Sequence, residues 1–233
     1  MDNDDDHIRP LSPFNVVPAT VWVLALAIIG IEVVFQLANF GLIGGPRGVG
    51  WRVSAVEQFG YSGAVLDRVM VQGDYSFSVL RRFVTYAFVN AGLMPAIFCT
   101  ALTLALGKFA TEYYGALRVV VIYFAAAIVG AVVFGLLVDT RFALVGSYTP
   151  VYGLIGAYTY ALWLKMGKAG ENQLMAFRLI GFLLMIQLVF GLIFGGNNQW
   201  VSELSGFFAG FALAIVLAPG GWARLLTRLR ERS

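Results

Sequence analysis

The chain has few of the residues that most catalytic sites and soluble surfaces need. It contains one cysteine, Cys99, and one histidine, His7, so neither an intrachain disulfide nor a zinc site built from these residue types can form. Only 12% of its 233 residues are charged, whereas soluble domains have about 25%. We therefore expect no cofactor and no metal ion. The net charge of +3 is spread along the chain, and no nucleic acid partner is expected.

Apolar sequence is abundant instead. Hydrophobic residues make up 59% of the chain, and the mean hydropathy is +0.79. The apolar runs are continuous and lack the in/out alternation of membrane barrels. At roughly 20 residues per helical crossing, they predict an all-α integral membrane protein with six transmembrane helices. The expected spans are Val17–Gly44, Phe83–Leu106, Val119–Val138, Val151–Leu164, Leu174–Phe194 and Val201–Leu217.

Polar segments divide the chain into a membrane domain and two tails. Residues 1–15 are an acidic N-terminal tail, 16–218 the membrane domain and 219–233 a basic C-terminal tail. Because Met1–Asp6 lacks the positive charge of a secretory signal, the first apolar run is expected to remain as a span. The first loop, 45–80, mixes apolar and charged residues. It lies either partly in the membrane interface or in solvent with a few packed apolar side chains.

The distribution of Lys and Arg predicts the orientation. Six spans place both termini on one side, which would carry ten basic residues against six on the other. This excess favours a multi-pass protein of the cell inner (plasma) membrane with both termini in the cytoplasm. The ten are Arg9, Lys108, Arg118, Lys165, Lys168, Arg178, Arg224, Arg228, Arg230 and Arg232, and the six are Arg47, Arg52, Arg68, Arg81, Arg82 and Arg141.

Two acidic residues fall within or beside the expected spans. Glu32 lies near the middle of the first span and Glu203 at the start of the sixth. Acids are costly in hydrocarbon, so each is a candidate functional residue. For Glu32 we weigh a structural hydrogen bond, in one polar stripe with Gln36, against a proton path. For Glu203 we weigh an intramembrane site against a wet position at the mouth of the helix.

Three segments share motifs and spacing with a known family. They are Arg81–Gly115, Gly146–Ala157 and Ser202–Ala214. In order and spacing they resemble the rhomboid intramembrane serine proteases. The second helix of that family bears HxxxxHxxxN, the short fourth helix bears GxSGxxxG, and the sixth bears a His three residues before GxxxG. The resemblance implies a rhomboid-like bundle with a short, Gly-rich, central fourth helix.

The catalytic residues of the family do not carry over. Tyr148 stands at the position of the nucleophile and Glu203 at that of the base. Asn90 and Pro95 stand at the two His positions of the second helix, and Cys99 at the Asn position associated with the oxyanion hole. No catalytic residue is therefore expected, and the resemblance implies a rhomboid pseudoprotease.

The small residues of the resemblance predict how two spans pack. Gly153 and Gly156 in the fourth helix, and Gly206 and Gly210 in the sixth, would let the two backbones approach closely. Tyr148 and Glu203 would then face each other. We expect the Tyr148 hydroxyl to donate a hydrogen bond to the Glu203 carboxylate.

Three functional hypotheses follow. The leading one is a protein that binds transmembrane helices of client proteins without cleaving them, with membrane lipids as its other partners. The alternative is an active serine endopeptidase that uses Ser147, Thr149 or Ser202 in an unfamiliar geometry. The third is an accessory subunit of a membrane complex or an ion-coupled carrier that uses Glu32 and Glu203.

Overall fold

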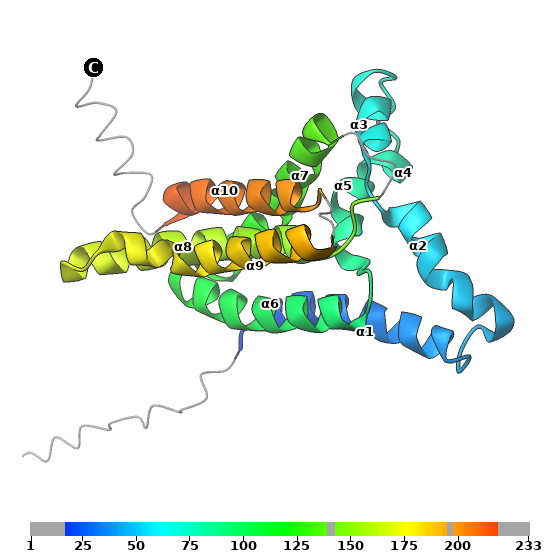
Figure 1. Cartoon of the computed structure of the whole chain (residues 1–233), viewed down its shortest axis with the longest axis horizontal. Helices are drawn as coiled ribbons and strands as arrows, with labels where there is room; N and C mark the ends of the chain where they lie inside the picture. Colours follow the sequence, from blue (N-terminus) through cyan, green and yellow to red (C-terminus); the bar gives the residue numbers. More distant parts are fainter. Residues whose placement is uncertain (1–16, 139–142, 195–197, 219–233) are drawn as a thin grey trace, which may run out of the picture.

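The computed structural model describes residues 17–138, 143–194 and 198–218, so the two predicted tails lie outside the described residues. The described part is a bundle of helices (Figure 1). Four of these helices, α1, α6, α7 and α10, are long and apolar enough to cross a membrane. The long helices are α1 (Ala19–Asn39), α6 (Leu93–Tyr114), α7 (Ala116–Leu137), α8 (Tyr148–Ala169), α9 (Arg178–Phe194) and α10 (Trp200–Leu217).

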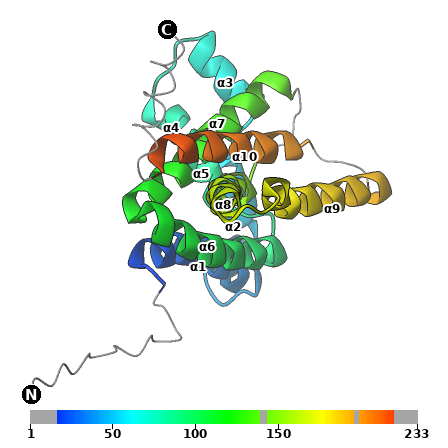
Figure 2. The same cartoon turned by 90° about the vertical axis from the view of Figure 1, so that its left-hand side faces the viewer.

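The central helix of the bundle is α8. Figure 2 looks along α8 and shows it surrounded by α1 and α6 below, α7 and α10 above, and α9 at its side. Every residue from Thr149 to Ala157 is buried, so this half of the helix is covered on all sides. Its position explains why Gly, Ala and Thr alternate there with larger residues, since close neighbours leave little room.

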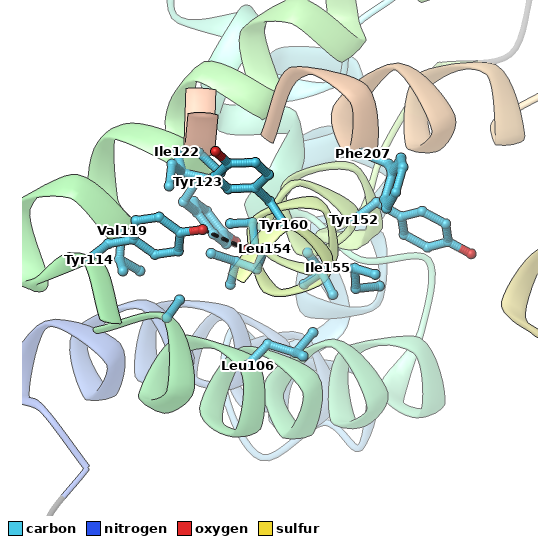
Figure 3. Close-up of a cluster of buried hydrophobic side chains, with 14 of the residues drawn as sticks. Leu106, Tyr114, Val119, Ile122, Tyr123, Tyr152, Leu154, Ile155, Tyr160 and Phe207 are labelled. Atoms are coloured by element: carbon cyan, nitrogen blue, oxygen red, sulfur yellow. Dashed lines mark hydrogen bonds between the residues drawn. The ribbon is translucent and has the colours of Figure 1, made fainter. Parts of the chain in front are cut away.

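Aromatic side chains with internal hydrogen bonds complete the core around α8. The Tyr114 hydroxyl donates to the Ala157 carbonyl at 2.8 Å and so ties α6 to α8 (Figure 3). The Tyr86 hydroxyl donates to the Ala127 carbonyl of α7 at 2.9 Å. A buried phenol without a partner is costly, and these bonds remove that cost while fixing how the helices are rotated.

The first loop folds into a series of short helices. Its middle packs on the end of α7, where Tyr61, Val65 and Leu66 are buried in a second cluster with Phe134. A single antiparallel bridge between Tyr61 and Leu144 joins it to the segment before α8. The short helices are η1 (Gly45–Gly50), α2 (Trp51–Phe59), α3 (Gly63–Met70), α4 (Phe77–Leu80), α5 (Arg82–Thr85) and η2 (Tyr86–Phe88), and η3 (Gln173–Phe177) follows α8.

The predicted start of the second span, Phe83, is wrong. Helical structure is interrupted after η2, and α6 begins only at Leu93. Pro95 therefore falls in the first turn of α6. Proline is tolerated there because the first amides of a helix have no intrahelical acceptor, whereas it would break a helix interior. The helix then runs on to Tyr114 and ends at Gly115, whose φ of +88° favours glycine.

The predicted short fourth helix is also wrong in length. The helix is central, but it has 22 residues and reaches Ala169, where Gly170 stops it in a left-handed conformation. Lys165 and Lys168 end the apolar run without ending the helix, because lysine is a good helix former. Apolar sequence therefore predicts only the first part of α8.

Candidate functional site

The start of α8 is held by the segment that precedes α6. The Ser147 amide donates to the Asn90 side-chain oxygen at 3.2 Å, and the Ser147 hydroxyl donates to the Ala87 carbonyl. The Gly146 amide donates to the Tyr86 carbonyl at 3.0 Å. Ser147 is completely buried. Its hydroxyl is thus engaged in a structural hydrogen bond at the position next to the family nucleophile.

A second pair of hydroxyls joins the starts of α8 and α10. The Thr149 and Ser202 oxygens are 2.9 Å apart, and the Ser202 hydroxyl also donates to the Gln199 carbonyl at 2.7 Å. A hydroxyl has one proton, so this geometry makes Thr149 the donor to Ser202. Both residues are buried. The pair satisfies two polar groups that would otherwise be stranded between helices.

The helices α8 and α10 meet at glycine. A Cβ atom placed on Gly206 would lie 2.4 Å from the Thr149 carbonyl oxygen, and one on Gly210 would lie 2.0 Å from the Gly153 carbonyl oxygen. On the other helix, a Cβ on Gly156 would lie 2.2 Å from the Phe207 carbonyl oxygen. Real atoms do not approach so closely. The backbones are therefore packed at a distance that only glycine permits at these positions.

Tyr148 and Glu203 lie at the starts of the same two helices. Glu203, in the first turn of α10, is 5% exposed, so it is not a wet residue at the helix mouth. Tyr148 is half-buried and packs against the core cluster around α8. The bond between the phenol and the carboxylate stays a prediction.

The remaining family positions lie on α6 or directly before it. Cys99 is a completely buried free thiol, and Pro95 sits one turn before it. Asn90, which lies before the helix, accepts from Ser147, and its side-chain nitrogen is buried without a hydrogen-bond partner. Proline offers no donor and a thiol only a weak one, so Pro95 and Cys99 themselves can do little to stabilise an oxyanion. Among the described residues no group of His, Cys, Asp or Glu could hold a metal ion, and His7 lies outside them.

Glu32 belongs to a separate polar cluster. Its carboxylate accepts two hydrogen bonds from the Arg52 guanidinium of α2, at 2.6 and 2.9 Å, and one from Gln36 at 2.7 Å. Glu32 is 1% exposed, and Arg52 is 25% exposed and lies over the Phe35 ring. A bidentate pair of this kind is a structural use of a buried acid. The predicted stripe with Gln36 is present.

Arg52 is the residue that sequence reasoning missed. The sequence marks it only as one of the loop cations, whereas in the structure it also donates to the Asn90 carbonyl at 2.6 Å. It thereby links α1, α2 and the segment that holds Ser147. One signal could have found it, because a buried acid in an apolar span needs a cation, and few cations in the chain adjoin the spans.

The fold and the site define a class of helical membrane protein with a buried central helix, α8. The start of α8 contacts the start of α10, and glycine residues let the two backbones pack closely. Comparison with protein families matches residues 78–220 to the rhomboid domain. The match covers more than half of the chain, and the chain belongs to the rhomboid family.

Two curated relatives are similar over the same part of the chain. Rhomboid-like protease 1 of Toxoplasma gondii is 24% identical over 135 residues, which are 58% of this chain and 46% of the relative. Rhomboid-like protease 3 of the same organism is 28% identical over 137 residues, which are 58% of this chain and 50% of the relative. The chain thus spans about half the length of the curated relatives it matches.

Proposed function

We propose that this rhomboid-family membrane protein binds transmembrane segments of client proteins without cleaving peptide bonds. The observation that carries the proposal is the pair of residues at the dyad positions, a phenol at Tyr148 and a carboxyl at Glu203. A hydroxyl becomes an effective nucleophile only when a positioned base removes its proton, and histidine is the usual base. The one histidine of the chain, His7, is far in sequence from these positions.

The hydroxyls near the dyad positions offer no substitute nucleophile. Ser147 donates to a backbone carbonyl, and the Thr149 and Ser202 oxygens share a hydrogen bond. Each would have to give up a buried hydrogen bond before it could attack a peptide carbonyl, at a cost of about 1–3 kcal/mol. Loss of a single oxyanion donor costs a further ~100-fold or more in rate, and Pro95 and Cys99 are poor replacements for such donors.

Helix binding, in contrast, needs only apolar surface and a stable scaffold. The outward faces of α1 and α9 expose large apolar side chains, among them Val23 and Phe182, which are 65% and 57% exposed. Glycine-packed spans keep the scaffold rigid without any catalytic group. The curated relatives are named as proteases, so proteolysis is the outcome that the first experiment must be able to detect.

The first experiment asks whether any serine is activated. The purified protein in detergent is treated with a labelled fluorophosphonate, beside the variants Ser147→Ala and Ser202→Ala and an active rhomboid protease as positive control. We expect no labelling of the native chain above that of the variants. Labelling that disappears in one variant would identify a nucleophile and overturn the proposal.

The second experiment restores the dyad alone. In the double variant Tyr148→Ser with Glu203→His, we expect no cleavage of a model transmembrane substrate, because Pro95 and Cys99 still supply no strong oxyanion donor. The matched variant adds Pro95→His and Cys99→Asn, which restores two of the three second-helix residues of the family pattern. Cleavage by the native chain would reject the proposal outright, and cleavage by the double variant would reject the role given to Pro95 and Cys99.

The third experiment tests client binding. A photoreactive amino acid is placed at Phe182 on α9 or at Val23 on α1, the two exposed apolar faces, and native membranes are irradiated. We expect a discrete protein adduct whose mapped peptide is a transmembrane segment. Lipid adducts alone at both positions would contradict client binding.

We further propose an inner-membrane location with both termini in the cytoplasm, supported by the excess of basic residues on that side. A reporter fused after Ser233 should behave as cytoplasmic, and one inserted near Gly60 as external. The reverse pattern would reject this orientation.

A further inference from the structure

Two apolar cavities flank the C-terminal half of α8. One, of about 160 Å³, lies between α6 and α8 and is lined by Phe109, Tyr113, Ala161, Leu164, Lys165 and Lys168. We name it the lysine pocket. The other, of about 390 Å³, lies between α8 and the η3–α9 segment, and Tyr158, Met166, Met175 and Arg178 are among its lining residues. Neither cavity contains a residue of the candidate site at the opposite end of α8.

The lysine pocket combines an apolar floor with a cationic rim. The rings of Phe109 and Tyr113 come from successive turns of α6, while Lys165 and Lys168 lie three residues apart and so share a face of α8. Both lysines are exposed. A lysine side chain has a long apolar stem and a charged end, which suits a site that is apolar inside and polar at its opening.

The two cavities are neighbours. Phe109 of the lysine pocket meets Tyr158 of the second cavity edge to face, with ring centroids 4.7 Å apart. Arg178 at the second cavity supplies a further cation. The end of α8 that carries the lysines extends beyond its neighbours at the left of Figure 1.

The charge at this end of the bundle is unbalanced. Between residues 108 and 118, and again between 165 and 178, the sequence has five basic residues and two acidic ones. Basic pockets between membrane helices are suited to anionic lipid head groups, whose phosphate is attracted by the cations while the chains contact the apolar floor. A neutral lipid gains only the second of these interactions.

We propose that the lysine pocket binds an anionic phospholipid, with the phosphate group at Lys165 and Lys168 and the glycerol or upper chain region against Phe109, Tyr113 and Leu164. Its volume is below the roughly 300 Å³ at which sites for drug-sized ligands begin, so it takes part of a lipid rather than a whole molecule. The rest of the lipid lies along α6 and α8 in the membrane.

The test measures lipid retention by the full chain. Protein in neutral detergent is mixed with equal amounts of dioleoyl-phosphatidylglycerol and dioleoyl-phosphatidylcholine, and bound lipid is counted by native mass spectrometry. We expect preferential retention of phosphatidylglycerol. In the double variant Lys165→Gln with Lys168→Gln its affinity should fall roughly 30-fold, the factor that two basic residues at an anionic surface provide.

Two further variants separate a built site from general attraction. Lys108→Gln with Arg118→Gln removes the same charge nearby but outside the lysine pocket and should change retention less than threefold. Leu164→Trp fills the pocket, leaves every charge in place and should abolish the preference. Helical circular dichroism and melting in detergent confirm that each variant is folded.

The outcomes are distinct. Equal losses in the two charge variants, or full retention in folded Leu164→Trp, would overturn the proposal and leave only non-specific attraction. Competition by millimolar inorganic phosphate would show that the cations bind free phosphate rather than a lipid, and would overturn it as well. None of these results depends on whether the protein binds client helices.

Discussion

The seam between α8 and α10 and the contact between α1 and α2 hold buried polar groups in different ways. At the seam a pair of neutral groups is buried, since the Thr149 hydroxyl donates to that of Ser202, and the backbones touch at glycine. Between α1 and α2 the groups are charged, and the long Arg52 side chain reaches Glu32 from the loop.

The difference follows from the room available and from the cost of burial. Two hydroxyls need little space and lose little when they leave water together. A carboxylate loses much more and needs a partner with several aligned donors, which a guanidinium provides. The ion pair is therefore found where a loop helix can bring a long side chain, and the hydroxyl pair is found where helices touch.

The largest expected effect comes from breaking the ion pair. Arg52→Gln should lower the free energy of unfolding by about 3 kcal/mol, because the buried Glu32 carboxyl would lose its main hydrogen-bond and ion-pair partner. Unfolding in mixed micelles of increasing sodium dodecyl sulfate measures this. The double variant Glu32→Gln with Arg52→Gln should lose less stability than Arg52→Gln alone. A single variant as stable as the native chain would remove the distinction between the two regions.

The next effect concerns the seam. Gly206→Leu should destabilise the fold by about 1–3 kcal/mol or more, because its first side-chain atom would overlap the Thr149 carbonyl. The control is Gly30→Leu in α1, where an added Cβ meets nothing within 4 Å and the stability should change by about 0.5 kcal/mol or less. Equal stability of the two variants in the same assay would contradict close packing at Gly206.

A smaller effect is expected from Tyr148→Phe. If the phenol donates to Glu203, its loss should cost on the order of 1–3 kcal/mol, which would make the seam resemble the α1–α2 contact in holding a partnered acid. Tyr75→Phe, at a residue 68% exposed, is the control and should change nothing measurable. If Tyr148→Phe leaves the free energy of unfolding unchanged, Glu203 relies on other partners.

The smallest effect concerns an exposed pair, Arg68 with Asp74. Hydrogen bonds from the side chain and backbone of Ser76, and then Arg68, hold the pKa of Asp74 below its usual value. The folded state thus binds this proton less readily than the unfolded state. The contribution is present above the ordinary pKa of about 4 and is lost as pH falls through the lower folded value. Asp74→Asn should flatten the stability profile slightly in that acidic range, and an unchanged profile would mean that the pair contributes nothing.

Much of this organisation could be predicted from sequence. The helical membrane class needed only the length and order of the apolar runs, and the central position of the fourth helix followed from the resemblance to the rhomboid proteases. Boundaries were harder. The second span was placed too early because Phe83 to Val89 is apolar, although Asn90 and Gly92 break the chain before α6. The predicted length of α8 was too short, because Lys165 and Lys168 continue a helix that apolarity alone would end.

The candidate site divides in the same way. The placement of Tyr148 and Glu203 at the dyad positions is a prediction made by counting positions along the sequence, since residue identity needs no geometry. The partners of Ser147 could not, because Ala87 and Asn90 are 60 and 57 residues away along the chain. Neither could the lysine pocket, since a cavity depends on how side chains of two helices fill the space between them.

The sequence by itself determined that this chain is a helical membrane protein, and it predicts that other residues stand at the catalytic positions of the rhomboid proteases, because hydropathy and residue type are local properties. The tertiary structure decided which polar groups pair. It brought Arg52 from a loop to Glu32 in a span and set Thr149 against Ser202, since a buried hydrogen bond or ion pair exists only where folding places two distant side chains within about 3 Å.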